Sequence, residues 1–102
     1  MMPTNFDRAR AAHSALQDFF AAHPKGKLER SALEHIHGLC HAAENAVSDD
    51  ECRRAIRNIE RYSALLYASE PPRRGADFVR LRVQNALASF RSNLRAVEAR
   101  QR

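Results

Sequence analysis

The apolar residues of this chain recur at steps of three and four in four separate stretches, which is the spacing of one face of an α-helix. In the first stretch the residues at these steps are Phe6, Ala9, His13, Leu16 and Phe20. No window shows the alternation of apolar and polar residues that is typical of a β-strand. The pattern therefore predicts an all-α protein with four amphipathic helices.

Start and stop signals give the expected helix boundaries. Thr4, with Asp7 three residues later, resembles a capping box. Ser48 stands before three acidic residues and is expected to cap the third helix, whereas Asp77 is expected to cap the fourth. Turns that contain proline should end the first and third helices. We expect helices over residues 4–23, 27–47, 49–69 and 77–99.

The connections between these helices are short, which limits how the helices can be arranged. Helices of about 20 residues are each about 30 Å long, and short loops between them force neighbours to run antiparallel. The length of 102 residues corresponds to one domain with an adequate core. The sequence therefore predicts a single domain over residues 1–102, an antiparallel up-down four-helix bundle.

Cysteine usage and hydropathy indicate where such a protein would reside. Cys40 and Cys52 lie on apolar faces of the predicted helices, where a cysteine behaves as a small buried hydrophobe. Residues 1–12 are polar and do not resemble a secretory leader. No apolar run approaches the ~20 residues of a membrane span. We expect a cytoplasmic protein with reduced thiols and no membrane partner.

The formal net charge of +5 is carried entirely by the second half of the chain. Residues 1–47 are balanced, whereas residues 48–102 hold twelve arginines against seven acidic residues. Clustered arginines can bind phosphates or an acidic protein, but they can also serve only to solvate helix surfaces. The arginines expected to contact a partner are Arg53, Arg57, Arg61, Arg73 and Arg74.

A second, weaker apolar line on the fourth helix suggests self-association. It includes Phe78, Leu81, Ala88 and Ser92, where small residues would let another helix approach closely. The opposing interpretation is that surface alanines are merely good helix formers and that Phe78 folds under the preceding linker. A homodimer through the fourth helix is therefore a hypothesis.

Two histidines have a spacing that a transition metal accepts. His37 and His41 are one helical turn apart, and Glu34 precedes His37 by three residues, as in the Glu-x-x-His unit of di-metal bundles. Such a site needs two of these units facing the core, and this chain has one, beside the core stripe. We expect no native metal site, with His37 and His41 as the weak candidates.

No other constellation indicates catalysis or a cofactor. Cys40 and His41 are adjacent and point about 100° apart on a helix, so they cannot form a dyad. The chain has no glycine-rich phosphate loop and no Cys-x-x-Cys pair. The sequence predicts a small non-enzymatic, regulatory helical module without a cofactor. A protein is its first expected partner, and a backbone-directed nucleic-acid contact through the same arginines is the alternative.

Overall fold

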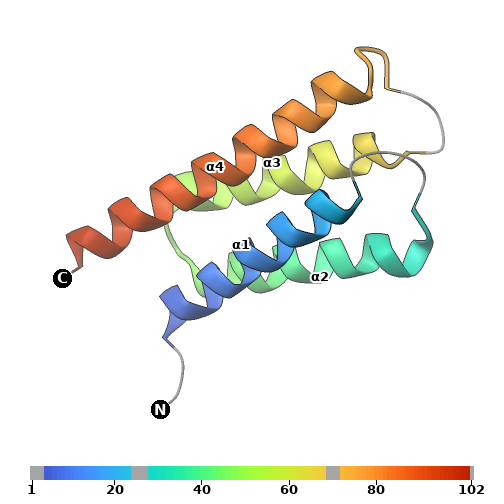
Figure 1. Ribbon diagram of the computed structural model, residues 1–102. Helices are drawn as coiled ribbons and strands as arrows, with labels where there is room; N and C mark the ends of the chain where they lie inside the picture. Colours follow the sequence, from blue (N-terminus) through green and yellow to red (C-terminus); the bar gives the residue numbers. More distant parts are fainter. Residues whose placement is uncertain (1–3, 24–27, 69–71, 102) are drawn as a thin grey trace.

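The computed structural model describes residues 4–23, 28–68 and 72–101, and these residues form four helices and no strand. The helices are α1 (Asn5–Ala22), α2 (Arg30–Ala46), α3 (Asp50–Leu66) and α4 (Ala76–Arg100). Successive helices run in opposite directions and pack side by side (Figure 1). The predicted antiparallel four-helix bundle is confirmed.

The helix starts agree with the expected caps at one site and differ at two. At α1 the Thr4 backbone N–H donates to the Asp7 carboxylate and the Asp7 N–H donates to the Thr4 hydroxyl, both at 3.1 Å. At α3 the predicted Ser48 cap is wrong, because the Cys52 N–H donates to Asp49 at 3.0 Å. A carboxylate accepts this bond more strongly than a hydroxyl and suits the positive end of the helix dipole.

The start of α4 depends on a glycine. Gly75 precedes the helix with a φ of 88°, in the left-handed region that side chains disfavour, so the predicted Asp77 cap is wrong. Asp77 lies instead in the first turn, where its charge still favours the helix dipole. Helix α2 begins at Arg30, later than expected; residues 24–27 lie outside the described residues.

The end of α3 also differs from the prediction. The helix ends at Leu66 because Tyr67 leaves the helical conformation, and its hydroxyl donates to the His23 carbonyl. The expected final residues of this helix include position 69, which is outside the described residues.

The core is built from the predicted stripes of all four helices. Leu16, Ile56, Ile59 and Phe90 are fully buried, and each such side chain contributes about 1.5–3 kcal/mol through removal from water. Phe6, which was expected inside, is only half-buried, whereas the neighbouring stripe residues of α1 are covered. None of the described helices is long and apolar enough to cross a membrane.

The four helices do not pack equally. Helix α3 packs most extensively along α4, and α1 along α2, whereas α1 and α4 have the smallest contact of the neighbouring pairs. The bundle therefore consists of two hairpins, α1–α2 and α3–α4. Arg10 bonds to Glu98 across the α1–α4 seam near the amino-terminal end of α1. Farther along the seam the two helices leave a groove between them.

Candidate binding site on the α3–α4 hairpin

The arginines predicted to contact a partner fall into two groups, and the first group is occupied within the chain. Arg53 donates to the backbone carbonyls of Val47 at 3.2 Å and Glu44 at 3.4 Å. These carbonyls lie at the end of α2, where no further helical turn supplies donors. Arg57 pairs with the Glu44 carboxylate at 3.1 Å. Both arginines thus hold α3 to α2, a role that the sequence pattern did not suggest.

The second group lies toward the other end of α3 and the start of α4. The Arg61 guanidinium lies 5.7 Å from the ring centroid of Tyr62. Arg74 and Arg82 each lie 5.0 Å from the ring centroid of Phe78. Cation–π contacts of this kind stabilise exposed arginines by about 0.5–1 kcal/mol.

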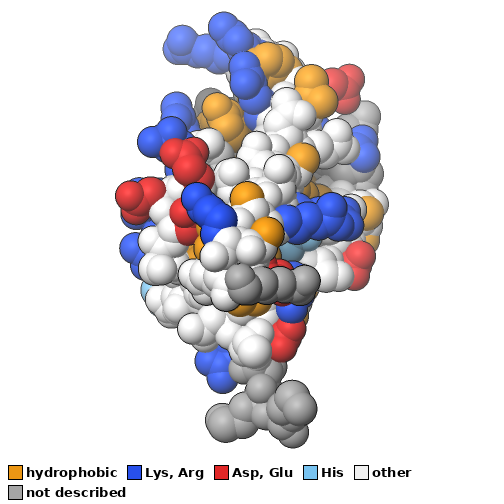
Figure 2. All heavy atoms as spheres, turned by 90° about the vertical axis from the view of Figure 1, so that its left-hand side faces the viewer, with side chains coloured by type: hydrophobic (Ala, Val, Ile, Leu, Met, Phe, Trp, Pro, Cys, Tyr) orange, Lys and Arg blue, Asp and Glu red, His pale blue; other side chains and the backbone are white. Residues whose placement is uncertain are grey.

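Apolar side chains form the surface between these arginines. A shallow hollow of about 580 Å³ is lined by Tyr62, Leu65 and Phe78 and by Arg73, Arg74 and Arg82. Leu65 is 44% exposed, and Leu81, one turn beyond Phe78 on α4, is 53% exposed. Figure 2 shows Lys and Arg side chains beside hydrophobic ones at the upper end of the molecule, the height at which α4 begins in Figure 1.

We call this surface the α3–α4 patch. It comprises Tyr62, Leu65, Phe78 and Leu81 together with Arg61, Arg73, Arg74 and Arg82. Within the described part of the chain, none of these four arginines has a carboxylate within 4.0 Å. The patch therefore combines exposed apolar side chains with arginines that no described carboxylate neutralises.

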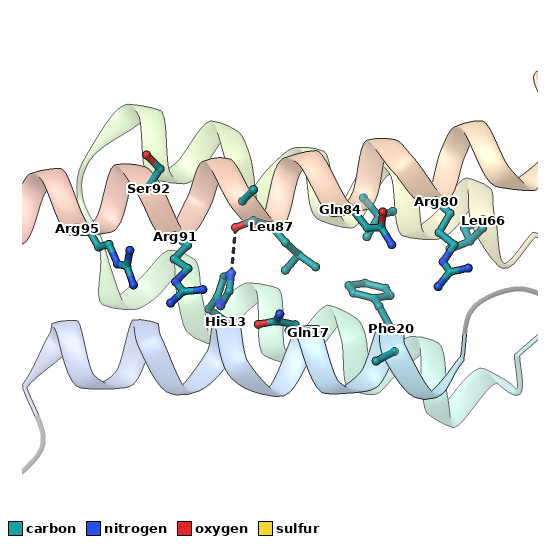
Figure 3. Close-up of a pocket in the computed structure, with 13 residues that line it drawn as sticks. His13, Gln17, Phe20, Leu66, Arg80, Gln84, Leu87, Arg91, Ser92 and Arg95 are labelled. Atoms are coloured by element: carbon teal, nitrogen blue, oxygen red, sulfur yellow. Dashed lines mark hydrogen bonds between the residues drawn. The ribbon is translucent and has the colours of Figure 1, made fainter.

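The residues predicted for self-association are also divided. Phe78 and Leu81 belong to the α3–α4 patch, whereas Ala88 and Ser92 border the separate groove between α1 and α4, with the Ser92 side chain pointing away from α1 (Figure 3). Sequence reasoning did not select Leu65 or Arg82 for any site. Leu65 falls off the predicted core stripe of α3, which is the one signal that could have identified it.

His37 and His41 of α2 are both exposed. His37 bonds to Glu60 of α3, and the rings of His37 and His41 are 6.3 Å apart. The carboxylates that could have completed a metal site are used elsewhere, because Glu34 pairs with Arg30 at 3.2 Å and Glu44 with Arg57. Among the residues that the structure describes, no group of three or more His, Cys, Asp or Glu side chains could hold a metal ion.

Both cysteines are fully buried and free. Burial raises the pKa of the Cys40 thiol to about 12 and, as the largest cause, that of Cys52 to about 12 as well. A thiol with such a pKa stays protonated at neutral pH, and the thiolate is the nucleophilic form. These cysteines are core residues.

Comparison of the chain with models of protein families, with curated proteins and with solved structures found no match.

Proposed function

We propose that this protein is a non-enzymatic, cytoplasmic binding module that docks an acidic segment of a partner protein on the α3–α4 patch. The observation that carries this proposal is the exposed apolar surface of Leu65 and Leu81 beside the partly buried Phe78, bordered by arginines that have no carboxylate partner among the described residues. The buried, protonated thiols support the non-enzymatic part, because the chain offers no activated cysteine.

The composition of the patch favours a protein partner. Burial of apolar surface contributes about 25 cal/mol per Å², and arginine and aromatic residues are enriched in protein interfaces. A partner with aliphatic or aromatic side chains among acidic ones would cover Leu65 and Leu81 and neutralise Arg74 and Arg82. A nucleic-acid backbone would neutralise the same arginines but would leave both leucines uncovered, so it is the second candidate.

The charge of the patch weighs against a second copy of the chain as the occupant. A two-fold dimer through Phe78 and Leu81 would place the arginines of one copy close to those of the other. Like charges brought together at an interface oppose association. An acidic partner meets no such repulsion.

The test compares a patch variant with a variant of the same charge change elsewhere. Arg74→Glu/Arg82→Glu reverses two arginines of the patch, and Arg8→Glu/Arg30→Glu reverses two exposed arginines of α1 and α2. Affinity enrichment from the native cell should recover a partner with the wild type and the control but not with the patch variant. A partner retained by the patch variant, or lost equally with both variants, would contradict docking at the patch.

A separate titration decides between protein and nucleic acid. Fluorescence anisotropy of labelled DNA and RNA at low and at physiological salt measures binding driven by phosphate contacts. We expect no binding at physiological salt. Binding at physiological salt that depends steeply on salt concentration and is lost in the patch variant would contradict a protein partner. It would make nucleic acid the partner of the patch instead.

A further inference from the structure

A second cavity lies on the other side of α4, between α4 and α1. This α1–α4 groove has a volume of about 630 Å³ and lies between the two neighbouring helices that have the smallest contact. Its floor is formed by buried apolar side chains, Phe20 of α1, Leu66 of α3, and Val83 and Leu87 of α4, and Ala21 and Ala88 lie beside them. Figure 3 shows side chains of α1 and α4 pointing toward one another across this space. Cavities of roughly 300–1,000 Å³ with mostly apolar walls and a few polar groups are typical of small-molecule sites.

The charged groups of the groove are all basic. Arg80, Arg91 and Arg95 line it from α4, and no Asp or Glu is among its described lining residues. Most arginines of the described chain bond to a carboxylate or a carbonyl or lie over a ring. The described arginines with none of these contacts are Arg8, Arg73, Arg80, Arg91 and Arg95. Three of these line one groove, and none of the three has a carboxylate within 4.0 Å among the described residues.

The arginines are placed unevenly along the groove. Arg91 and Arg95 are one helical turn apart and close one end as a pair, whereas Arg80 lies about 16 Å from Arg91 along the axis of α4. Between these ends α4 contributes Val83, Gln84, Leu87 and Ala88 to the lining. The groove therefore has a cationic end followed by a stretch that is neutral and mostly apolar.

The wall contributed by α1 is neutral and fixed in place. The His13 Nε2–H donates to the Leu87 carbonyl at 2.9 Å, and the ring lies edge-on to Phe90 with centroids 5.7 Å apart. Burial lowers the pKa of His13, the hydrogen bond to Leu87 partly opposes this effect, and the positive charge of Arg91 lowers the pKa again, so that it lies below the ordinary value of 6.5. The imidazole is therefore neutral at pH 7, and beside it the Gln17 amide completes a wall without charge.

We propose that the α1–α4 groove binds a long-chain carboxylate, whose headgroup bonds to Arg91 and Arg95 and whose hydrocarbon chain lies over Leu87, Val83 and Phe20. Arginine donates to a carboxylate through two parallel N–H groups, which makes the pair a specific receptor for this headgroup. The hydrocarbon tail of the ligand covers the apolar floor of the groove. Arg80 lies at the far end of the floor, where its methylene groups can cover the chain while its guanidinium stays in water. This site is separate from the α3–α4 patch and does not depend on the function proposed for it.

The probe is dodecanoate, because the length of its extended hydrocarbon tail is comparable with the separation of Arg80 and Arg91. It is titrated into the full protein chain by isothermal titration calorimetry. We expect saturable binding of one ligand per chain. Arg91→Gln/Arg95→Gln removes two charge-assisted donors and should weaken the affinity at least about tenfold. The matched control Arg8→Gln/Arg73→Gln removes two other unpaired arginines and should bind as the wild type does.

Two further measurements separate this site from nonspecific adsorption. Dodecanol, which has the chain without the carboxylate, should bind the wild type much more weakly than dodecanoate does. Ala88→Trp places a large side chain at the rim of the groove without changing charge and should abolish binding, with amide NMR spectra confirming an intact fold. The patch variant Arg74→Glu/Arg82→Glu should bind dodecanoate normally, so failure of the patch hypothesis leaves this result unaffected.

The proposal would be overturned by non-saturable binding, by equal affinity for dodecanol, or by unchanged affinity in both groove variants. It would also be overturned if dodecanoate did not bind while an acidic amphipathic peptide bound and perturbed the amides of α1 and α4. That outcome would make the groove a docking site for a helix.

Discussion

Gly38 lies in the middle of α2, and its replacement by alanine should stabilise the protein. The residue is exposed, and a methyl group added there would have no heavy atom within 4 Å. Nothing in the folded chain therefore opposes the substitution. Glycine in a helix interior is about 0.8–1.0 kcal/mol less favourable than alanine, because the unfolded chain loses more backbone freedom on folding. We expect the free energy of unfolding to rise by about 1 kcal/mol and the Tm by about 4–8 °C.

The assay is urea unfolding followed by far-UV circular dichroism. The dependence of the free energy of unfolding on urea concentration should be the same for the variant and the wild type, which checks two-state behaviour. Ala42→Gly is the matched control, because Ala42 is exposed on the same helix one turn later and should lose a similar free energy. If Ala42→Gly destabilised the protein but Gly38→Ala did not stabilise it, the reasoning would be refuted. The glycine would then serve a close approach to another molecule that the single chain does not contain.

Three further predictions concern the caps, the buried histidine and the thiols. Asp49→Ala should lower the free energy of unfolding by about 1 kcal/mol in urea, whereas Ser48→Ala should change it by less than about 0.5 kcal/mol; equal losses would contradict the assigned cap. Because folding lowers the pKa of His13 below its ordinary value of 6.5, the unfolded chain binds the proton more readily. The contribution of neutral His13 to the free energy of unfolding should thus be complete above pH 6.5 and fall on acidification. His13→Gln should make the free energy of unfolding less dependent on pH in this range. The thiols of Cys40 and Cys52 should react with a thiol reagent only slowly at neutral pH until urea is added, as followed by mass spectrometry; rapid labelling of the native protein would disprove their burial.

The fold could be predicted from the sequence because each helix carries its own apolar stripe. Leu16, Ile56 and Phe90 lie on those stripes and are buried as expected. The caps were less predictable, since Ser48 and Asp49 are adjacent and either can accept the first bond. Which of them does so depends on the backbone conformation of the loop between α2 and α3. That conformation is set by how the two helices pack and cannot be derived from the local sequence.

The candidate sites were predictable only in part, because an arginine's role depends on residues far from it in sequence. Arg53 is expected from the sequence to contact a partner, whereas in the structure it donates to backbone carbonyls at the end of α2. Phe78 and Arg74 were assigned to different functions, although their side chains are in contact. The groove was not expected at all. Arg91 and Arg95 were visible as basic residues of the fourth helix, but the small contact between α1 and α4 is a property of the assembled bundle.

The two hairpins of the bundle also differ in net charge. Residues 1–47, which include α1 and α2, are formally neutral, whereas residues 48–102 carry the whole +5. The molecule therefore has an electric dipole directed across the bundle, from one hairpin to the other. As a polyanionic molecule approaches, this dipole turns the α3–α4 hairpin toward it before any contact forms. The association rate constant should consequently fall as salt is added, even for a complex whose final stability comes from apolar contacts.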